Sequence, residues 1–264
     1  MSKEIEQAEA IFDHFESIWR ERYGEAGPVI QVAEGEKVAE RFEVGQFGYG
    51  IMASIMRTGR ALVILAQSGY AVEASPMFRS LLDQAMALEA LLVHGVHAVH
   101  AFGLEHKFNF EQLLKAADEG FPLGQSDREY ISKFLAMAEA LPRTKELNQA
   151  QNGIKTSTIG RQQGQWEKYL YQMWLFATPL SKPSMKLADM YSQAEVEAGG
   201  IRMLTFLDSD PDATVDPRLV LQMVVPGALL AFALSLRDTA FAEQVRTEAM
   251  GFDLPIDPRF EAGE

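Results

Sequence analysis

The chain has 264 residues, of which 47% are hydrophobic and 23% charged, values typical of a folded globular protein. Its 37 acidic and 24 basic residues give a net charge of −13, which argues against binding to nucleic acids or anionic membranes, because those surfaces attract clustered Lys and Arg. The absence of cysteine excludes disulfides, thiolate catalysis and Cys-ligated zinc, and it is compatible with the cytoplasmic location that we expect.

Residues 1–44 are predicted to form an N-terminal amphipathic helix and a linker. Apolar residues recur at three- and four-residue steps from Ile5 to Tyr23, with Glu and Arg between them. No apolar run typical of a signal peptide is present there. Residues 31–42 are polar and are consistent with a short exposed helix. The bundle core is expected to occupy residues 45–264.

The middle of the chain is predicted to be helical, with turns at glycine and proline. Ser75-Pro76 and Ser126 are typical of helix starts, since Ser caps a first turn and Pro lacks an N–H that would go unpaired there. The predicted helices run approximately over residues 46–68, 76–94, 96–118 and 126–141.

The second half contains a longer irregular stretch. Residues 143–165 are polar, Gln-rich and without visible periodicity, so we expect a long loop. Asp216-Pro217 again predicts a helix start. The remaining expected elements are helices over 166–177 and 183–197, an isolated strand over 201–207, and a last helix or helix pair from 217 to about 250.

These elements predict an all-α protein, a single-domain bundle of seven to nine helices. The segment from Leu219 to Leu236 is almost entirely apolar, but it contains a central Pro226-Gly227 and is at or just below the roughly 20 residues that span a bilayer. We interpret it as a buried core helix, with a membrane span as the alternative.

Four of the five histidines lie between residues 94 and 106. His94, His97 and His100 step by three and fan across roughly 120° of a helix surface. A zinc helix usually presents His at i and i+4, and no Asp or Glu is interleaved here at ligand spacing. We therefore expect no metal and no cofactor. The alternative is a metal-dependent helical enzyme that uses these histidines or His106.

A polar cluster on the predicted helix 76–94 is a stronger candidate for a site. Arg79 and Asp83 are one turn apart on one face, and Glu73 in the preceding loop could reach the same region. After Gln84 the helix is apolar on almost all sides apart from Glu89, so it is predicted to lie inside the bundle. Charges in such a place are paired or serve a site, and the alternative is a structural Arg79–Asp83 ion pair.

The pattern Gly69…Glu73-Ala74…Arg79-Ser80-Leu81-Leu82-Asp83 resembles a bacterial all-helical family known only as a domain of unknown function. That family pairs a Gly…Glu-Ala…Arg-Ser-Leu-x-Glu helix with a later Tyr-x-x-x-Ser-x-x-x-His-x-Ser element. The later element is matched at Trp174, Thr178, Lys182 and Ser184, in a resemblance that spans about 45–205. Trp replaces Tyr, Thr replaces Ser, Asp83 replaces Glu, and Lys182 stands in the histidine position.

The resemblance implies that Arg79, Asp83, Thr178, Lys182 and Ser184 share one pocket, with Glu73 near it. Two cations with hydroxyls suit an anionic group such as phosphate or carboxylate. Lysine titrates far from neutrality unless it is desolvated, so the general-base role that a histidine could play is less available.

The leading hypothesis is an uncharacterised helical protein that binds an anionic small molecule, or a protein partner through its acidic surface. The alternative is a hydrolase or transferase acting on phosphate- or nucleotide-like substrates, with Asp83 as the catalytic base and with Arg79 and Lys182 as an electrostatic clamp. Twelve methionines and the aromatic helix 166–177 also make a homodimer plausible.

Overall fold

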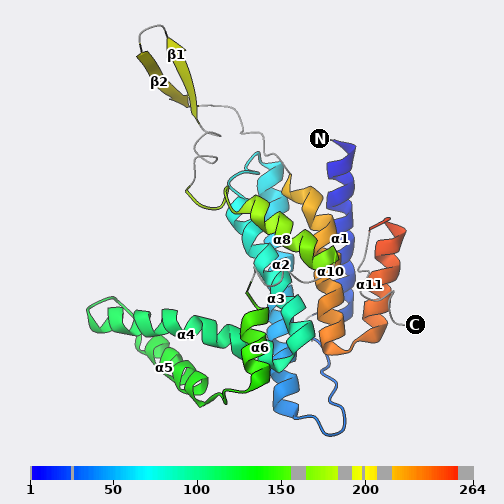
Figure 1. Ribbon diagram of the computed structural model, residues 1–264. Helices are drawn as coiled ribbons and strands as arrows, with labels where there is room; N and C mark the ends of the chain where they lie inside the picture. Colours follow the sequence, from blue (N-terminus) through cyan, green and yellow to red (C-terminus); the bar gives the residue numbers. More distant parts are fainter. Residues whose placement is uncertain are drawn as a thin grey trace.

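The computed structural model describes residues 2–24, 27–155, 165–183, 192–197, 200–206 and 216–254. Within these segments the chain forms nine helices and one two-stranded hairpin, which confirms the all-α class (Figure 1). The helices are α1 (Lys3–Tyr23), α2 (Val38–Gln67), α3 (Ser75–His94), α4 (Val96–Asp118), α5 (Gln125–Ala140), α6 (Lys145–Gly153), α8 (Gln165–Ala177), α10 (Pro217–Leu236) and α11 (Thr239–Gly251). The antiparallel strands are β1 (Ser192–Glu197) and β2 (Gly200–Phe206).

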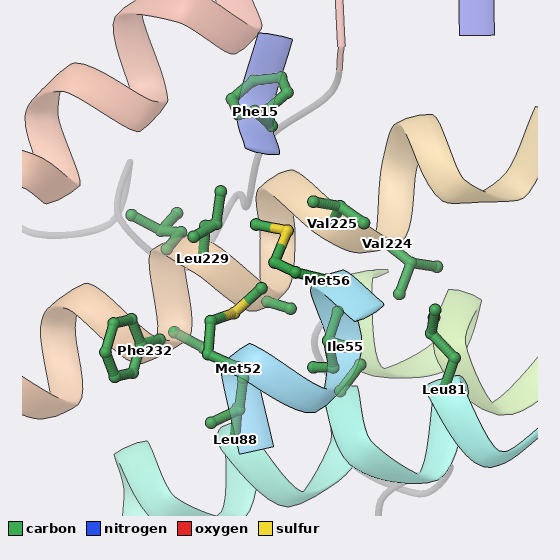
Figure 2. Packing of buried hydrophobic residues seen from close by; sticks show 14 of the residues in the cluster. Phe15, Met52, Ile55, Met56, Leu81, Leu88, Val224, Val225, Leu229 and Phe232 are labelled. Atoms are coloured by element: carbon green, nitrogen blue, oxygen red, sulfur yellow. The ribbon is translucent and has the colours of Figure 1, made fainter. Parts of the chain in front are cut away.

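Helix α10 lies in the middle of the core and packs against α1, α2, α3 and α11. Asp216 caps its first turn by accepting a hydrogen bond from the Arg218 backbone N–H (2.9 Å), and Pro217 occupies the first turn. Val224 and Phe232 are fully buried among side chains of α2 and α3 (Figure 2). Burial of each such side chain stabilises the fold by about 1.5–3 kcal/mol. The segment is therefore a buried core helix, as predicted.

Two of the described helices, α2 and α10, are long and apolar enough to cross a membrane by length and composition. Most of α10 is buried inside the bundle, which is what a core helix requires. Such helices are weak evidence for a membrane span, and the cytoplasmic location stays a prediction.

Helix α1 contributes to the same core. Phe12 and Phe15 are buried, and Arg60 of α2 forms ion pairs with Asp13 (2.7 Å) and Glu16 of α1. Helix α2 begins at Val38, eight residues before the predicted start. The polar segment 31–42, which was expected to form a short separate helix, therefore lies in the approach to α2 and in its first turn. The division into residues 1–44 and 45–264 stays a prediction.

Helices α4 and α5 form an arm that projects from the bundle (Figure 1). Gly95 ends α3 with a positive φ of 54°, a conformation that favours glycine, and α4 starts at the next residue. Phe110 of α4 and Phe134 of α5 pack edge to face with ring centroids 4.9 Å apart. Helix α6 then returns along α4 to α3, and this return builds a cleft beside α3.

The structure corrects several local predictions. Residues 145–153 of the expected loop form α6, where the Thr144 hydroxyl accepts a hydrogen bond from the Leu147 N–H (3.1 Å). Residues 192–197, expected to be helical, form β1, which pairs with the strand that was expected to be isolated. Ser75 and Ser126 are not caps, because Ala74 and Gly124 precede α3 and α5 without a side-chain cap bond.

Candidate functional site

Helices α3 and α8 meet at a cluster of Arg79, Asp83 and Trp174. The Trp174 indole Nε1–H donates a hydrogen bond to Asp83 Oδ1 (2.8 Å), and the Arg79 guanidinium lies 4.8 Å from the centroid of the Trp174 ring. Among the described residues no ion pair joins Arg79 to Asp83, and the indole contacts both side chains instead of the structural ion pair that was the alternative prediction. The Arg79 Nε atom is buried and has no hydrogen-bond partner in that part of the chain.

A second indole–carboxylate hydrogen bond joins the same two helices. Trp166 Nε1–H donates to Glu89 Oε1 (2.7 Å), and both side chains are buried, with exposed fractions of 7% and 2%. Because Trp166 contacts Glu89 while Trp174 contacts Asp83, α8 runs antiparallel to α3 and is held at both ends. Trp166 also packs directly against Gly227 of α10, where a Cβ atom would collide with the indole ring. These contacts fix the position of Trp174 relative to Asp83.

Asp83 lies in the wall of a pocket rather than in the core. Its side chain is exposed to solvent, but the surrounding protein removes part of the water around its carboxyl group. This burial raises the pKa of Asp83, and the charge of Glu105 raises it further. The hydrogen bond from Trp174 and the nearby positive charges of Arg79 and Lys182 act in the opposite direction. A carboxyl group with a raised pKa in a pocket is a candidate for binding or proton transfer.

Two adjoining pockets form a cleft between α3, α4 and α6. The inner pocket, of about 280 Å³, is lined by Asp83, Met86, Ala87, Phe102, Glu105, Ile154 and Lys155. The outer pocket, of about 390 Å³, is lined by Ala101, Leu104, Glu105, Asn148, Gln151, Asn152, Ile154 and Lys155. Because they share Glu105, Ile154 and Lys155, the two pockets lie side by side, and their volumes suit a small molecule.

The later predicted element lies beside this cluster. The Thr178 hydroxyl donates a hydrogen bond to the Trp174 carbonyl oxygen (2.7 Å), so it serves the end of α8 rather than the pocket. Lys182 is exposed in the turn after α8 and lies near enough to Asp83 to lower its pKa. Neither residue lines the cleft.

The two other predicted ligand-binding residues are Glu73 and Ser184. Glu73 is exposed in the turn of residues 71–74 that precedes α3. Ser184 lies outside the described residues. Arg79 and Lys182 therefore lie near enough to Asp83 to lower its pKa, and of these three residues only Asp83 lines the cleft.

His94 and His100 contact different neighbours, and His97 lies near both. His100 Nε2 lies 2.9 Å from Glu43 Oε2 on α2, and the His97 and His100 rings meet edge to face at 6.5 Å. His94 packs against Gly153 of α6, and its burial, followed by the charge of His97, lowers its pKa. No group of three His, Cys, Asp or Glu residues suited to a metal occurs in the part of the chain that the structure describes.

Comparison with known families matches residues 47–190 to a family of unknown function (DUF5677). The match covers more than half of the chain and extends from α2 to beyond α8. The chain belongs to this family. Comparisons with curated proteins and with solved structures find no match.

The DUF5677 segment contains Arg79, Asp83, Trp174 and every residue that lines the two pockets. The correspondence of single motif positions and the bacterial origin stay predictions. The sequence did not point to Glu105 or Lys155. Glu105 lies near Asp83 through the packing of α4 on α3, and Lys155 through the return of α6, which the polar segment 143–165 did not predict.

Proposed function

We propose that this protein binds a small polar molecule in the cleft between α3, α4 and α6. The observation that carries the proposal is the position of Asp83, a candidate from the sequence whose pKa is raised and which lines the inner pocket. The Trp174 hydrogen bond holds the Asp83 carboxyl at the pocket wall, so the site is preorganised. Polar side chains from α4 and α6 supply further hydrogen-bonding groups, and apolar ones cover the remaining wall.

The prediction of an anionic ligand depends on Arg79 and Lys182. Both lie near Asp83, but neither lines either pocket. Among the described residues, Lys155 is the only basic side chain that lines them, so an anionic group in the cleft would face it. A protein partner and a homodimer stay as further proposals from the acidic charge and the methionine content.

A second candidate function is catalysis on phosphate- or nucleotide-like groups, with Asp83 as a general acid or base. The raised pKa of Asp83 favours this role, because it moves the carboxyl toward the range in which proton transfer is efficient. Its electrostatic clamp would require Arg79 and Lys182 to turn from Trp174 and solvent toward a substrate.

The binding proposal is tested by thermal unfolding in the presence of a panel of small polar metabolites. A ligand at a hundred times its Kd stabilises the folded state by about 2.7 kcal/mol. For a chain of this size that amounts to a rise of roughly 5 °C or more in Tm. We expect the rise in the natural chain and in Lys133→Trp, which alters an exposed position on α5 outside the cleft.

Gln151→Trp fills the outer pocket and should abolish the rise in Tm. The proposal is wrong if no compound raises the Tm of the natural chain. It is also wrong if Gln151→Trp and Lys133→Trp respond to the same compounds to the same extent.

A further inference from the structure

Among the described residues, three charged side chains line the inner pocket, and their charges do not cancel. Asp83 and Glu105 are acidic, and Lys155 is basic. Within the described residues, Glu105 makes neither a hydrogen bond nor an ion pair. The Lys155 ammonium donates to Asn152 Oδ1 (3.0 Å) and pairs with neither carboxylate in that part of the chain. The described lining of the pocket therefore carries one net negative charge, and Arg79 and Lys182, which lie near Asp83, are not part of that lining.

The two carboxylates are close enough to affect each other. The charge of Glu105 raises the pKa of Asp83, which means that the two groups repel when both are ionised. The Trp174 indole satisfies only Asp83 Oδ1. A positively charged group between Asp83 and Glu105 would remove the repulsion and would use carboxylate oxygens that remain open to the pocket.

We propose that the cleft takes a small organic amine, whose ammonium group lies between Asp83 and Glu105 in the inner pocket. This inference rests on the proposed function and specifies the ligand of the same cleft. An ammonium group offers three N–H donors, which matches a pair of carboxylates. The carbon chain of the amine would run along Met86 and Phe102 toward the amides of the outer pocket.

The shape and lining of the cleft favour an amine over a metal ion. An inner pocket of about 280 Å³ is larger than a bare ion requires, and apolar side chains form much of its wall. In the outer pocket Asn148, Gln151 and Asn152 supply amide groups that accept or donate hydrogen bonds. The net charge of −13 also raises the local concentration of cations near the chain.

Three probes of similar length distinguish the possible charges of the ligand. Putrescine carries two ammonium groups, 4-aminobutyrate carries one ammonium group and one carboxylate, and succinate carries two carboxylates. We expect isothermal titration at low ionic strength to give the tightest binding for putrescine, weaker binding for 4-aminobutyrate and none for succinate. Glu105→Gln should weaken putrescine binding at least tenfold. Glu111→Gln should leave it unchanged, because Glu111 lies on the same helix but pairs with Lys107 outside the cleft.

Each other outcome overturns the amine inference. If putrescine binds Glu105→Gln as tightly as the natural chain, it binds elsewhere. If succinate binds and Lys155→Met abolishes that binding, the cleft takes an anion, and the proposed small-molecule function stands. If none of the three probes binds, the amine is wrong, and the Gln151→Trp comparison with the wider panel decides the proposed function separately.

Discussion

The two indole–carboxylate hydrogen bonds between α8 and α3 allow one substitution to be compared at two depths of burial. Trp166→Phe and Trp174→Phe each remove an indole N–H that donates to a carboxylate, over 2.7 and 2.8 Å. The acceptor Glu89 is only 2% exposed, whereas Asp83 lies at an open pocket. Water can replace the lost donor at Asp83 but not at Glu89, so the two substitutions should differ in their cost.

The expected costs follow from this difference. Withdrawing a donor from a buried carboxylate costs about 2–3 kcal/mol. The smaller ring at Trp166 also leaves about 40 Å³ empty beside Gly227, which adds about 1 kcal/mol at about 24 cal/mol per Å³. Trp166→Phe should therefore reduce the free energy of unfolding by about 3–4 kcal/mol. Trp174→Phe should reduce it by about 1 kcal/mol, since solvent hydrates Asp83 and a phenyl ring can still pack under Arg79.

Urea unfolding followed by far-UV circular dichroism measures both changes without depending on tryptophan fluorescence. The midpoints of the transitions report stability when the slope of the transition is the same in both variants. Equal losses of stability in the two variants would refute this prediction, as would a larger loss for Trp174→Phe, because burial of the acceptor would then not set the cost.

Three further predictions concern packing, protonation and capping. In Gly59→Ala the new Cβ atom would lie 2.6 Å from Cε2 of the buried Phe12, so calorimetry should show a loss of stability of about 1–3 kcal/mol. Gly50→Ala, on the same helix, meets open space and should gain about 0.5–1 kcal/mol. Similar Tm values for the two variants would contradict this prediction. The pKa of His94 is below its usual 6.5 in the fold, so its contribution to stability is complete above pH 6.5 and is lost as the pH falls through the folded-state pKa. In urea titrations, His94→Gln should therefore lose less stability than the natural chain between pH 7.5 and 5.5. Equal losses in the two proteins would count against this prediction. Asp216→Ala loses a helix cap and an ion pair, whereas Asp216→Asn keeps a capping oxygen. Chemical denaturation should show Asp216→Ala to be about 1 kcal/mol less stable than Asp216→Asn. Equal stability of the two variants would mean that the cap contributes nothing.

Most of the bundle could be predicted because its helices carry strong local signals. The cap and proline at Asp216 mark the start of α10, and its continuous apolar sequence requires burial wherever it packs. Gly95 separates α3 from α4 at a backbone conformation that glycine adopts readily. These signals depend on a few neighbouring residues, so they can be read without knowing the tertiary contacts.

The cleft could be predicted only in part, because it depends on contacts between distant segments. The spacing of Arg79 and Asp83 placed both on one face of α3, but nothing local shows that an indole from α8 would lie between them. Helix α6 has too few apolar residues for a visible pattern, and it is short enough to need tertiary packing for stability. Without α6, Lys155 could not be placed near Asp83.

The two faces of α3 have different surroundings in this member of the DUF5677 family. One face, which includes Leu81 and Leu88, packs into the core with α2 and α10, and the last of these helices lies outside the matched segment 47–190 (Figure 2). The face that carries Asp83 turns toward α8 and the cleft instead. Because α10 holds the core face in place, the polar face of α3 can keep Asp83 at the pocket wall near Glu105 of α4, although the two carboxylates repel when both are ionised. In our proposal a bound ammonium group relieves this repulsion.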